Sequence, residues 1–201
     1  MTGSSALASA GALLAALLVG CASHAAKQPV GTVSKTFHAY RADGELSVQV
    51  ADVSTGSCWT MSIAATSASA FRCISDNSIL DPCFAPARPG RPLEVACIPD
   101  PWTGATVLRV SGALPTGGPP AGRTPHPWAI ELANGARCVV ATGTVPAVQG
   151  VNLGYHCRNG ANAALADTTG QAGKGQYAKA KYALAGATTL LTVTVSTIWR
   201  V

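Results

Sequence analysis

The sequence predicts an all-β domain, mostly antiparallel, with the form of a sandwich or barrel built from two similar halves and stapled by disulfides. An α+β fold is the alternative. Segments that alternate apolar and polar residues, as half-buried strands do, recur along the chain. Two stretches, whose corresponding cysteines are 80 and 84 positions apart, repeat the same order of strand, turn and cysteine. Six cysteines remain once Cys21 is set aside, and an even number suits a disulfide framework.

The first element is an uncharged stretch that runs from Met1 to Cys21. Its apolar core over 6–19 has the length of a signal-peptide core and is shorter than the roughly 20 apolar residues that cross a bilayer. It ends in Leu18-Val19-Gly20-Cys21, which resembles the lipobox of bacterial lipoproteins, although no Lys or Arg precedes it. The resemblance implies that residues 1–20 form a lipoprotein signal peptide and that the Cys21 thiol carries diacylglycerol. The alternative is a secretory signal cut elsewhere, with Cys21 removed or left as an ordinary thiol.

Beyond the lipobox the chain divides into a tether, two halves and a linker. Residues 21–34 are mostly small or polar, so we expect a flexible tether there. We expect a single β-rich domain over 35–201, with pseudo-repeat halves 35–111 and 128–201. Residues 112–127 join the halves, and their five prolines and four glycines disfavour the interior of either a helix or a strand.

Alternating and β-branched runs predict where the strands lie. In the first half we expect strands over 46–52, 93–98 and 106–110. The C-terminal run predicts a long strand with one apolar face, formed by Leu191, Val193, Val195, Thr197, Trp199 and Val201.

One hairpin of the second half can be predicted in register. It joins Trp128–Leu132 to Ala136–Val140 through a three-residue loop, with Gly135 in the left-handed conformation. This register sets Ile130 against Cys138, Trp128 against Val140 and Glu131 against Arg137. A two-residue loop would instead set charged residues against apolar partners.

The two halves resemble weak copies of each other. The run 46–52 followed by Cys58 parallels the run 128–134 followed by Cys138. Further on, Phe71-Arg72-Cys73 parallels Tyr155-His156-Cys157. We expect a pseudo-symmetric domain made from two β units, and the alternative is coincidence in a sequence rich in Ala, Gly and Thr.

The six cysteines after Cys21 are expected to form disulfides, because the chain is predicted to be exported. Their spacing contains no Cys-x-x-Cys and no Cys/His alternation, which disfavours a redox motif or a zinc site. Six cysteines allow 15 pairings, and the sequence alone does not choose among them. We prefer the pairing of neighbours, in which each bridge contributes about 3 kcal/mol: Cys58 with Cys73, Cys83 with Cys97, and Cys138 with Cys157.

No motif of catalysis or metal binding stands out. The G-x-S-x-G elbow and the paired-histidine spacing of metalloproteases are absent, and the segment 170–175 lacks the interval of a phosphate loop. His156 is better explained as an exposed strand-end residue than as a general base. The oxygen-rich segment 76–81 lacks the EF-hand order, so turn chemistry explains it more simply than calcium. We therefore predict no catalytic residue, no metal ligand and no cofactor.

The tryptophans are the candidates for ligand contact. Trp59, Trp128 and Trp199 fall in alternating runs, so we expect them in the core. Trp102 follows a proline-rich turn and has no strand partner that the pattern assigns. It is therefore the aromatic residue that we predict to bind a ligand.

The net charge of +5, from 14 Lys and Arg against 9 Asp and Glu, is modest. A solvated surface explains it better than attraction to anionic lipid or cell-wall polymer, and we expect no nucleic-acid partner. The segment 170–201 is the exception, because its four cations occur without any acid: Lys174, Lys179, Lys181 and Arg200.

Composition, cysteine pattern and lipobox together are similar in general style to uncharacterised surface lipoproteins of GC-rich actinobacteria. The resemblance implies a cell-membrane location on the extracytoplasmic face, with lipid on Cys21 as the anchor. The function we favour is a non-catalytic module that binds an envelope protein, an envelope polymer or a small ligand. One alternative is a hydrolytic envelope enzyme, which requires His38, His126 or His156 to meet an acid or a serine. The other is a purely structural envelope protein.

Overall fold

The computed structural model describes residues 31–118, 126–166 and 179–201. Over these residues the fold is all-β, as predicted, and the α+β alternative is wrong. None of the described residues belongs to a helix that is long and apolar enough to cross a membrane. Several predicted features lie outside the described residues: the signal peptide 1–20, Cys21 with 22–30 of the tether, 119–125 of the linker, and 170–175 with Lys174.

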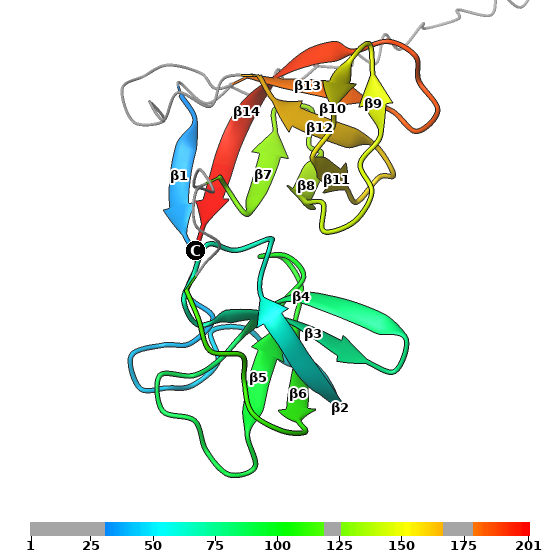
Figure 1. Ribbon diagram of the computed structural model, residues 1–201. Coiled ribbons are helices and arrows are strands. Elements are labelled where there is room, and N and C mark those ends of the chain that lie inside the picture. Colours follow the sequence, from blue (N-terminus) through cyan, green and yellow to red (C-terminus); the bar gives the residue numbers. More distant parts are fainter. Residues whose placement is uncertain (1–30, 119–125, 167–178) are drawn as a thin grey trace, which may run out of the picture.

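Five strands close into a first barrel, drawn in the lower part of Figure 1. Consecutive strands pair antiparallel, and the parallel pairing of β2 with β6 closes the ring. The strands predicted at 93–98 and 106–110 are confirmed as β5 and β6, but the run 46–52 is a strand only from Val50 onward because Leu46 bridges to Tyr40. The strands of the first barrel are β2 (Val50–Met61), β3 (Ala70–Ser75), β4 (Ser78–Phe84), β5 (Glu94–Cys97) and β6 (Ala105–Val110).

Six antiparallel strands form a second ring, the second barrel, in the upper part of Figure 1. The ring closes because β14 pairs with β13 and also with β7. Its strands are β7 (Ala129–Leu132), β8 (Arg137–Val140), β11 (Tyr155–Cys157), β12 (Asn162–Leu165), β13 (Lys179–Ala183) and β14 (Leu191–Arg200).

Three short strands lie outside the two rings. The small hairpin of β9 (Ala147–Val148) and β10 (Val151–Asn152) separates β8 from β11 along the chain. β1 (Val33–Thr36) pairs parallel to β14. The last two residues of the predicted tether, Val33 and Ser34, therefore lie in a strand, and Lys35 and Thr36 of the predicted first half pair with β14 of the second barrel.

The two barrels share one strand order, in agreement with the predicted similarity of the halves. β2 to β6 follow one another around the first barrel, and β8, β11, β12, β13 and β14 do so around the second. The difference is β7, which lies between β8 and β14 where the first barrel pairs β2 directly with β6. The predicted equivalence of the run 46–52 with the run 128–134 fails here, because residues 46–49 do not form a strand.

The hairpin of β7 and β8 has the predicted register. Ile130 lies opposite Cys138, and Glu131 lies opposite Arg137. The loop contains three residues, closed by a hydrogen bond from the Leu132 amide to the Ala136 carbonyl at 2.8 Å. Gly135 has a φ of +83°, the left-handed conformation that the loop requires.

The long C-terminal strand departs from the single apolar face that the sequence predicts. A bulge between Val195 and Thr197 shifts the pairing of β14 with β7 by one residue. Beyond the bulge Ile198 joins Val195 in the core of the second barrel, and Trp199 packs toward the junction with the first barrel. The reversal follows from the extra residue, since side chains alternate sides along a strand.

Each barrel has its own core, and a third apolar cluster fills the junction between them. There Trp128, which is 1% exposed, packs against Phe37 and Phe84 at centroid distances of 4.9 and 6.2 Å. Trp128 precedes β7 of the second barrel, whereas Phe84 ends β4 of the first. The two barrels are therefore joined by shared core packing as well as by the chain.

Candidate functional site

The six predicted cysteines form three disulfides, and the preferred pairing of neighbours is confirmed. Each bridge joins residues that lie directly opposite each other on adjacent antiparallel strands. The closed loops are short, with sequence separations of 15, 14 and 19 residues. The bridges are Cys58–Cys73, Cys83–Cys97 and Cys138–Cys157.

Two of these disulfides lie next to each other inside the first barrel. The sulfur atoms of Cys73, Cys83 and Cys97 all lie within 4.8 Å of one another, and the three residues are buried. Such a group has the composition of a metal site. However, each sulfur belongs to a disulfide and offers no thiolate, so the cluster acts as a pair of cross-links.

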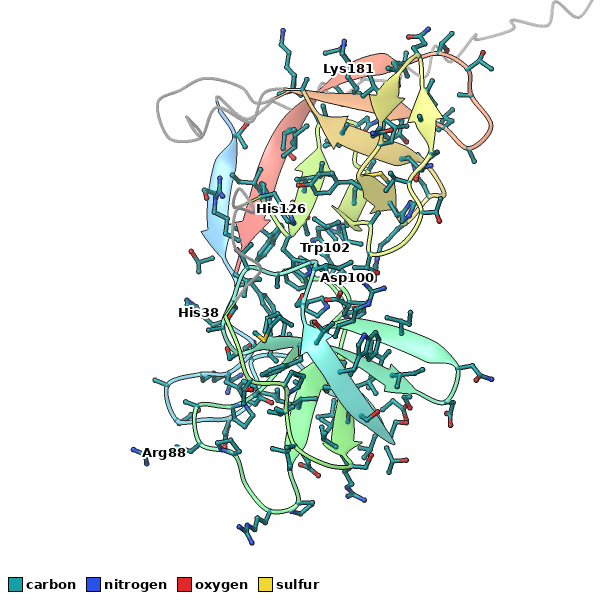
Figure 2. The ribbon with its side chains drawn as sticks, viewed as in Figure 1. His38, Arg88, Asp100, Trp102, His126 and Lys181 are labelled. Atoms are coloured by element: carbon teal, nitrogen blue, oxygen red, sulfur yellow. A yellow bond between two sulfur atoms is a disulfide. The ribbon has the colours of Figure 1, made fainter. Side chains whose placement is uncertain are left out.

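Trp102, the residue predicted to bind a ligand, lies in the turn between β5 and β6, next to the second barrel (Figure 2). Its ring is partly buried and meets Trp199 edge to face, with 6.4 Å between the centroids. The turn is held by a hydrogen bond in which the Trp102 backbone amide donates to the Asp100 carboxylate at 2.9 Å. A ligand role for Trp102 stays a prediction, whereas its contacts between the barrels are part of the fold.

Four charged side chains surround Trp102 at this junction. The indole Nε1 donates to the Glu131 carboxylate at 2.7 Å, and the guanidinium carbons of Arg137 and Arg158 lie 5.5 and 6.0 Å from the ring centroid. Each arginine also has an acidic partner. Arg137 lies 3.4 Å from Glu131, and Arg158 lies 3.0 Å from Asp100. Because the tryptophan and Asp100 come from the first barrel and the others from the second, this network holds the barrels in one orientation.

The outer surface of β2, β3 and β4 carries most of the exposed apolar side chains of the first barrel. We call it the Trp59 face and define it by Val53, Trp59, Ile74 and Ile79, which are 52, 48, 37 and 52% exposed. Ile74 and Ile79 lie opposite each other on β3 and β4. Arg72 shares their side of β3 and places its guanidinium carbon 5.7 Å from the Trp59 ring centroid. The expectation that Trp59 lies in the core is wrong.

Behind this face lies a buried acid. The Asp81 side chain has no exposed surface, and it accepts hydrogen bonds from the Ser62 hydroxyl at 2.5 Å and the Ile63 amide at 3.2 Å. Burial raises the pKa of Asp81, while the two hydrogen bonds and Arg72, at 4.0 Å, act in the opposite direction. Arg72 also donates to the Thr142 carbonyl of the second barrel at 2.9 Å. This chain of contacts runs from a buried carboxylate of the first barrel to a loop of the second.

The remaining candidate groups, His156 and the segment 76–81, lie in an exposed strand and in a tight turn with the strand that follows it. His156 is exposed, and its Nδ1 lies 2.5 Å from the Asn162 side-chain oxygen on the neighbouring strand. Asp76 and Asn77 form the tight turn between β3 and β4, with a φ of +50° at Asp76. The Asp81 carboxylate bonds to Ser62 and Ile63, which do not belong to that turn, so the oxygen-rich segment does not converge on one point.

Side-chain parity would have located two of the features that the sequence analysis missed. Trp59 follows the inward-facing Cys58, so alternation turns it outward. Arg137 and Arg158 flank Cys138 and Cys157, and the preferred disulfide already implies that these arginines lie side by side. The partners of Asp81 had no such signal, because Ser62 and Arg72 reach it from different strands and loops.

Comparisons of the chain with protein-family models, with curated proteins and with solved structures found no match.

Proposed function

We propose that this protein is a lipid-anchored, extracytoplasmic, non-catalytic module that binds an envelope protein through the Trp59 face. The observation that supports the anchor is how the cysteines are used. Three bridges take six of the seven cysteines and leave Cys21, the one at the lipobox. Disulfides of this kind are typical of proteins that fold in an oxidising compartment outside the cytosol.

The binding role is supported by the apolar character and rigidity of the Trp59 face. Four of the eight large hydrophobic side chains that are exposed among the described residues belong to this face. Exposed apolar groups gathered in this way mark interaction surfaces more often than chance positions do, and tryptophan with arginine is the usual centre of a protein interface. Two disulfides hold the strands beneath this face, so little conformational entropy is lost on binding.

Mass spectrometry of the membrane-extracted protein tests the anchor. We expect an N-terminus at Cys21 that carries acyl mass, and a gain of six hydrogens on reduction, two for each of the three bridges. The Cys21→Ser variant should lack the lipid and leave the membrane fraction while it keeps the three bridges. Recovery of a soluble protein that retains Met1 and seven free thiols would refute the proposal.

Site-specific photo-cross-linking in intact cells tests the binding face. A photoreactive amino acid at Ile79 should yield one discrete adduct with an envelope protein, and Trp59→Ala should abolish that adduct. The matched position is Leu184, an equally exposed apolar residue of the second barrel, which should not yield it. The same adducts from both positions, or none from Ile79, would exclude this face as the binding surface.

A further inference from the structure

The charges of the chain are divided unequally between its two barrels. Residues 37–110 contain seven of the nine acids and five arginines. Residues 128–201 contain six Lys and Arg residues but only two acids. The excess positive charge therefore belongs to the second barrel, whereas the first is close to neutral or slightly acidic.

Within the second barrel, lysines and exposed apolar side chains gather on the β13–β14 hairpin. Lys179 is exposed at the start of β13, and Lys181 lies opposite Thr192, to whose hydroxyl it donates at 3.0 Å. Leu184 and Leu191, at the end of this hairpin, are 56 and 55% exposed. A hairpin that carries both lysine and exposed leucine has the composition of a surface that meets lipid headgroups.

The chain leaves the described structure beside this same hairpin. Thr32, just before β1, donates from its hydroxyl to the Val195 carbonyl of β14 at 2.7 Å. The adjoining residue of β14, Thr194, pairs with Lys179. Figure 2 shows Lys181 at one end of the molecule, Trp102 at its middle and Arg88 at the opposite end.

The length of chain before Thr32 limits how far this hairpin can lie from an anchor. The eleven residues 21–31 span at most about 40 Å when fully extended. An anchor at Cys21 therefore lets the basic hairpin reach the surface of the bilayer. Once the hairpin is at that surface, its lysines attract the headgroups, because attraction between exposed charges acts within about 8 Å at physiological ionic strength.

We infer that the β13–β14 hairpin of the second barrel, with Lys179 and Lys181, rests on the anionic headgroups of the anchoring membrane. The molecule then stands end-on, with the first barrel and its Trp59 face directed outward. This inference rests on the proposed lipid anchor at Cys21. It adds to that anchor a second contact, of electrostatic origin, that sets the orientation of the protein.

Lysine labelling of the lipidated protein in vesicles tests the contact. We would compare vesicles of phosphatidylcholine with vesicles that also contain phosphatidylglycerol, and measure acetylation of each lysine by mass spectrometry. The potential of an anionic surface concentrates protons there about threefold, so the reactive neutral amines of Lys179 and Lys181 should decrease by about that factor or more. Lys35, whose amine lies 4.7 Å from the Trp199 ring centroid near the junction, is the internal reference and should not change.

Charge-reversal variants distinguish an effect of the hairpin lysines from an effect of the protein's net charge. On an anionic supported bilayer, the end-on protein should form a thicker layer in neutron reflectometry than on a zwitterionic bilayer. The variant K179E/K181E should remove this difference, as should 1 M salt. The variant R88E/R91E makes the same change of charge in the loop between β4 and β5. It should keep the difference in layer thickness between the two bilayers.

The outcomes also separate this inference from the proposed function. The lipid mass on Cys21 is verified first, and its absence would refute the anchor and the inference together. Lipidated protein in which Lys179 and Lys181 label equally on both vesicles would overturn the inference alone. Equal effects of K179E/K181E and R88E/R91E would also overturn it, because they would assign the orientation to net charge.

Discussion

The carboxyl group of Asp81 has no exposed surface, and this single side chain couples the stability of the first barrel to pH. Its ionised form keeps only partial compensation, from hydrogen bonds with Ser62 and the backbone of Ile63 and Ala64, and from Arg72 at 4.0 Å. Burial raises the pKa of Asp81 above the value that it has in the unfolded chain. The folded state therefore binds the proton more tightly, and its stability falls as pH rises through the folded-state pKa.

Asp81→Asn should remove this dependence, since an amide keeps the acceptor for Ser62 without carrying charge. We expect the free energy of unfolding of the unmodified protein to fall relative to that of Asp81→Asn as the pH rises from the ordinary pKa of an Asp carboxyl toward the raised pKa of Asp81. Urea denaturation at each pH measures the difference. Asp52→Asn, at an exposed acid of the same barrel, is the control. A difference between unmodified protein and Asp81→Asn that is constant with pH would contradict the prediction.

Two disulfides of the first barrel lie so close together that the loss of one cysteine should affect both bridges. In Cys83→Ser, the freed Cys97 thiolate lies within reach of the Cys73 sulfur. During refolding at alkaline pH it should attack that sulfur, form Cys73–Cys97 and release the Cys58 thiolate. Peptide mapping should find molecules with this new bridge in addition to molecules with Cys58–Cys73. The loss of one cross-link should lower the free energy of unfolding by about 3 kcal/mol.

The second barrel supplies the matched control for this exchange. Cys157→Ser also frees one thiol, that of Cys138, but the described residues place no second disulfide beside it. It should therefore lose stability without forming a new bridge. If Cys83→Ser retains only Cys58–Cys73, the proximity of the sulfurs has no chemical effect.

The geometry of some elements is determined by neighbouring residues in the sequence, whereas that of others depends on distant strands. The hairpin of β7 and β8 was predictable in register because its loop, its glycine and its alternation lie within 13 consecutive residues. The bulge in β14 was not predictable, because it depends on which strand pairs with β14 on its other side. The same holds for the ring closures, which join strands that are far apart in the sequence.

Two glycines, one in a strand and one in a hairpin loop, are required for different reasons. A Cβ on Gly56 of β2 would lie 2.0 Å from the Ile74 carbonyl oxygen of β3, whereas a Cβ on Gly135 would meet open space at a φ of +83°. Gly135→Ala should therefore cost only the conformational strain, about 1–2 kcal/mol. Gly56→Ala should cost about 3 kcal/mol or more, because two backbones must separate.

Chemical denaturation of the two glycine variants measures these costs directly. Hydrogen exchange should show faster exchange across β2 and β3 in Gly56→Ala, and a change confined to the β7–β8 loop in Gly135→Ala. A larger cost for Gly135→Ala than for Gly56→Ala would show that β2 and β3 do not approach as closely as the structure indicates.

The arrangement of the two barrels follows from features that the sequence pattern does not reveal. Alternation predicts which strands exist, and cysteine spacing suggested the three bridges, but neither predicts that β1 crosses to the second barrel. Nor does it predict that Trp102 would fill a junction. The absence of a strand partner gives no sign that its indole lies between Glu131 and Trp199, and a ligand role for Trp102 stays a prediction.

The junction cluster should make the two barrels unfold as one cooperative unit. Trp128 is 1% exposed and contacts Phe37 and Phe84, so Trp128→Ala should cost about 3–5 kcal/mol. Trp59→Ala removes the same side chain from an exposed position and should cost less than about 1 kcal/mol. Denaturation of the disulfide-intact variants, followed by circular dichroism, measures both values.

The location of the effect decides whether the barrels are coupled. Because the aromatic cluster draws side chains from both, Trp128→Ala should accelerate hydrogen exchange in β3 to β5 as well as in β7 and β8, while the denaturation curve stays a single transition. Faster exchange confined to the second barrel, or two separate transitions in the unmodified protein, would show that each barrel folds independently. The orientation held by Trp102, Asp100 and Arg158 would then be a surface contact rather than a consequence of shared core packing.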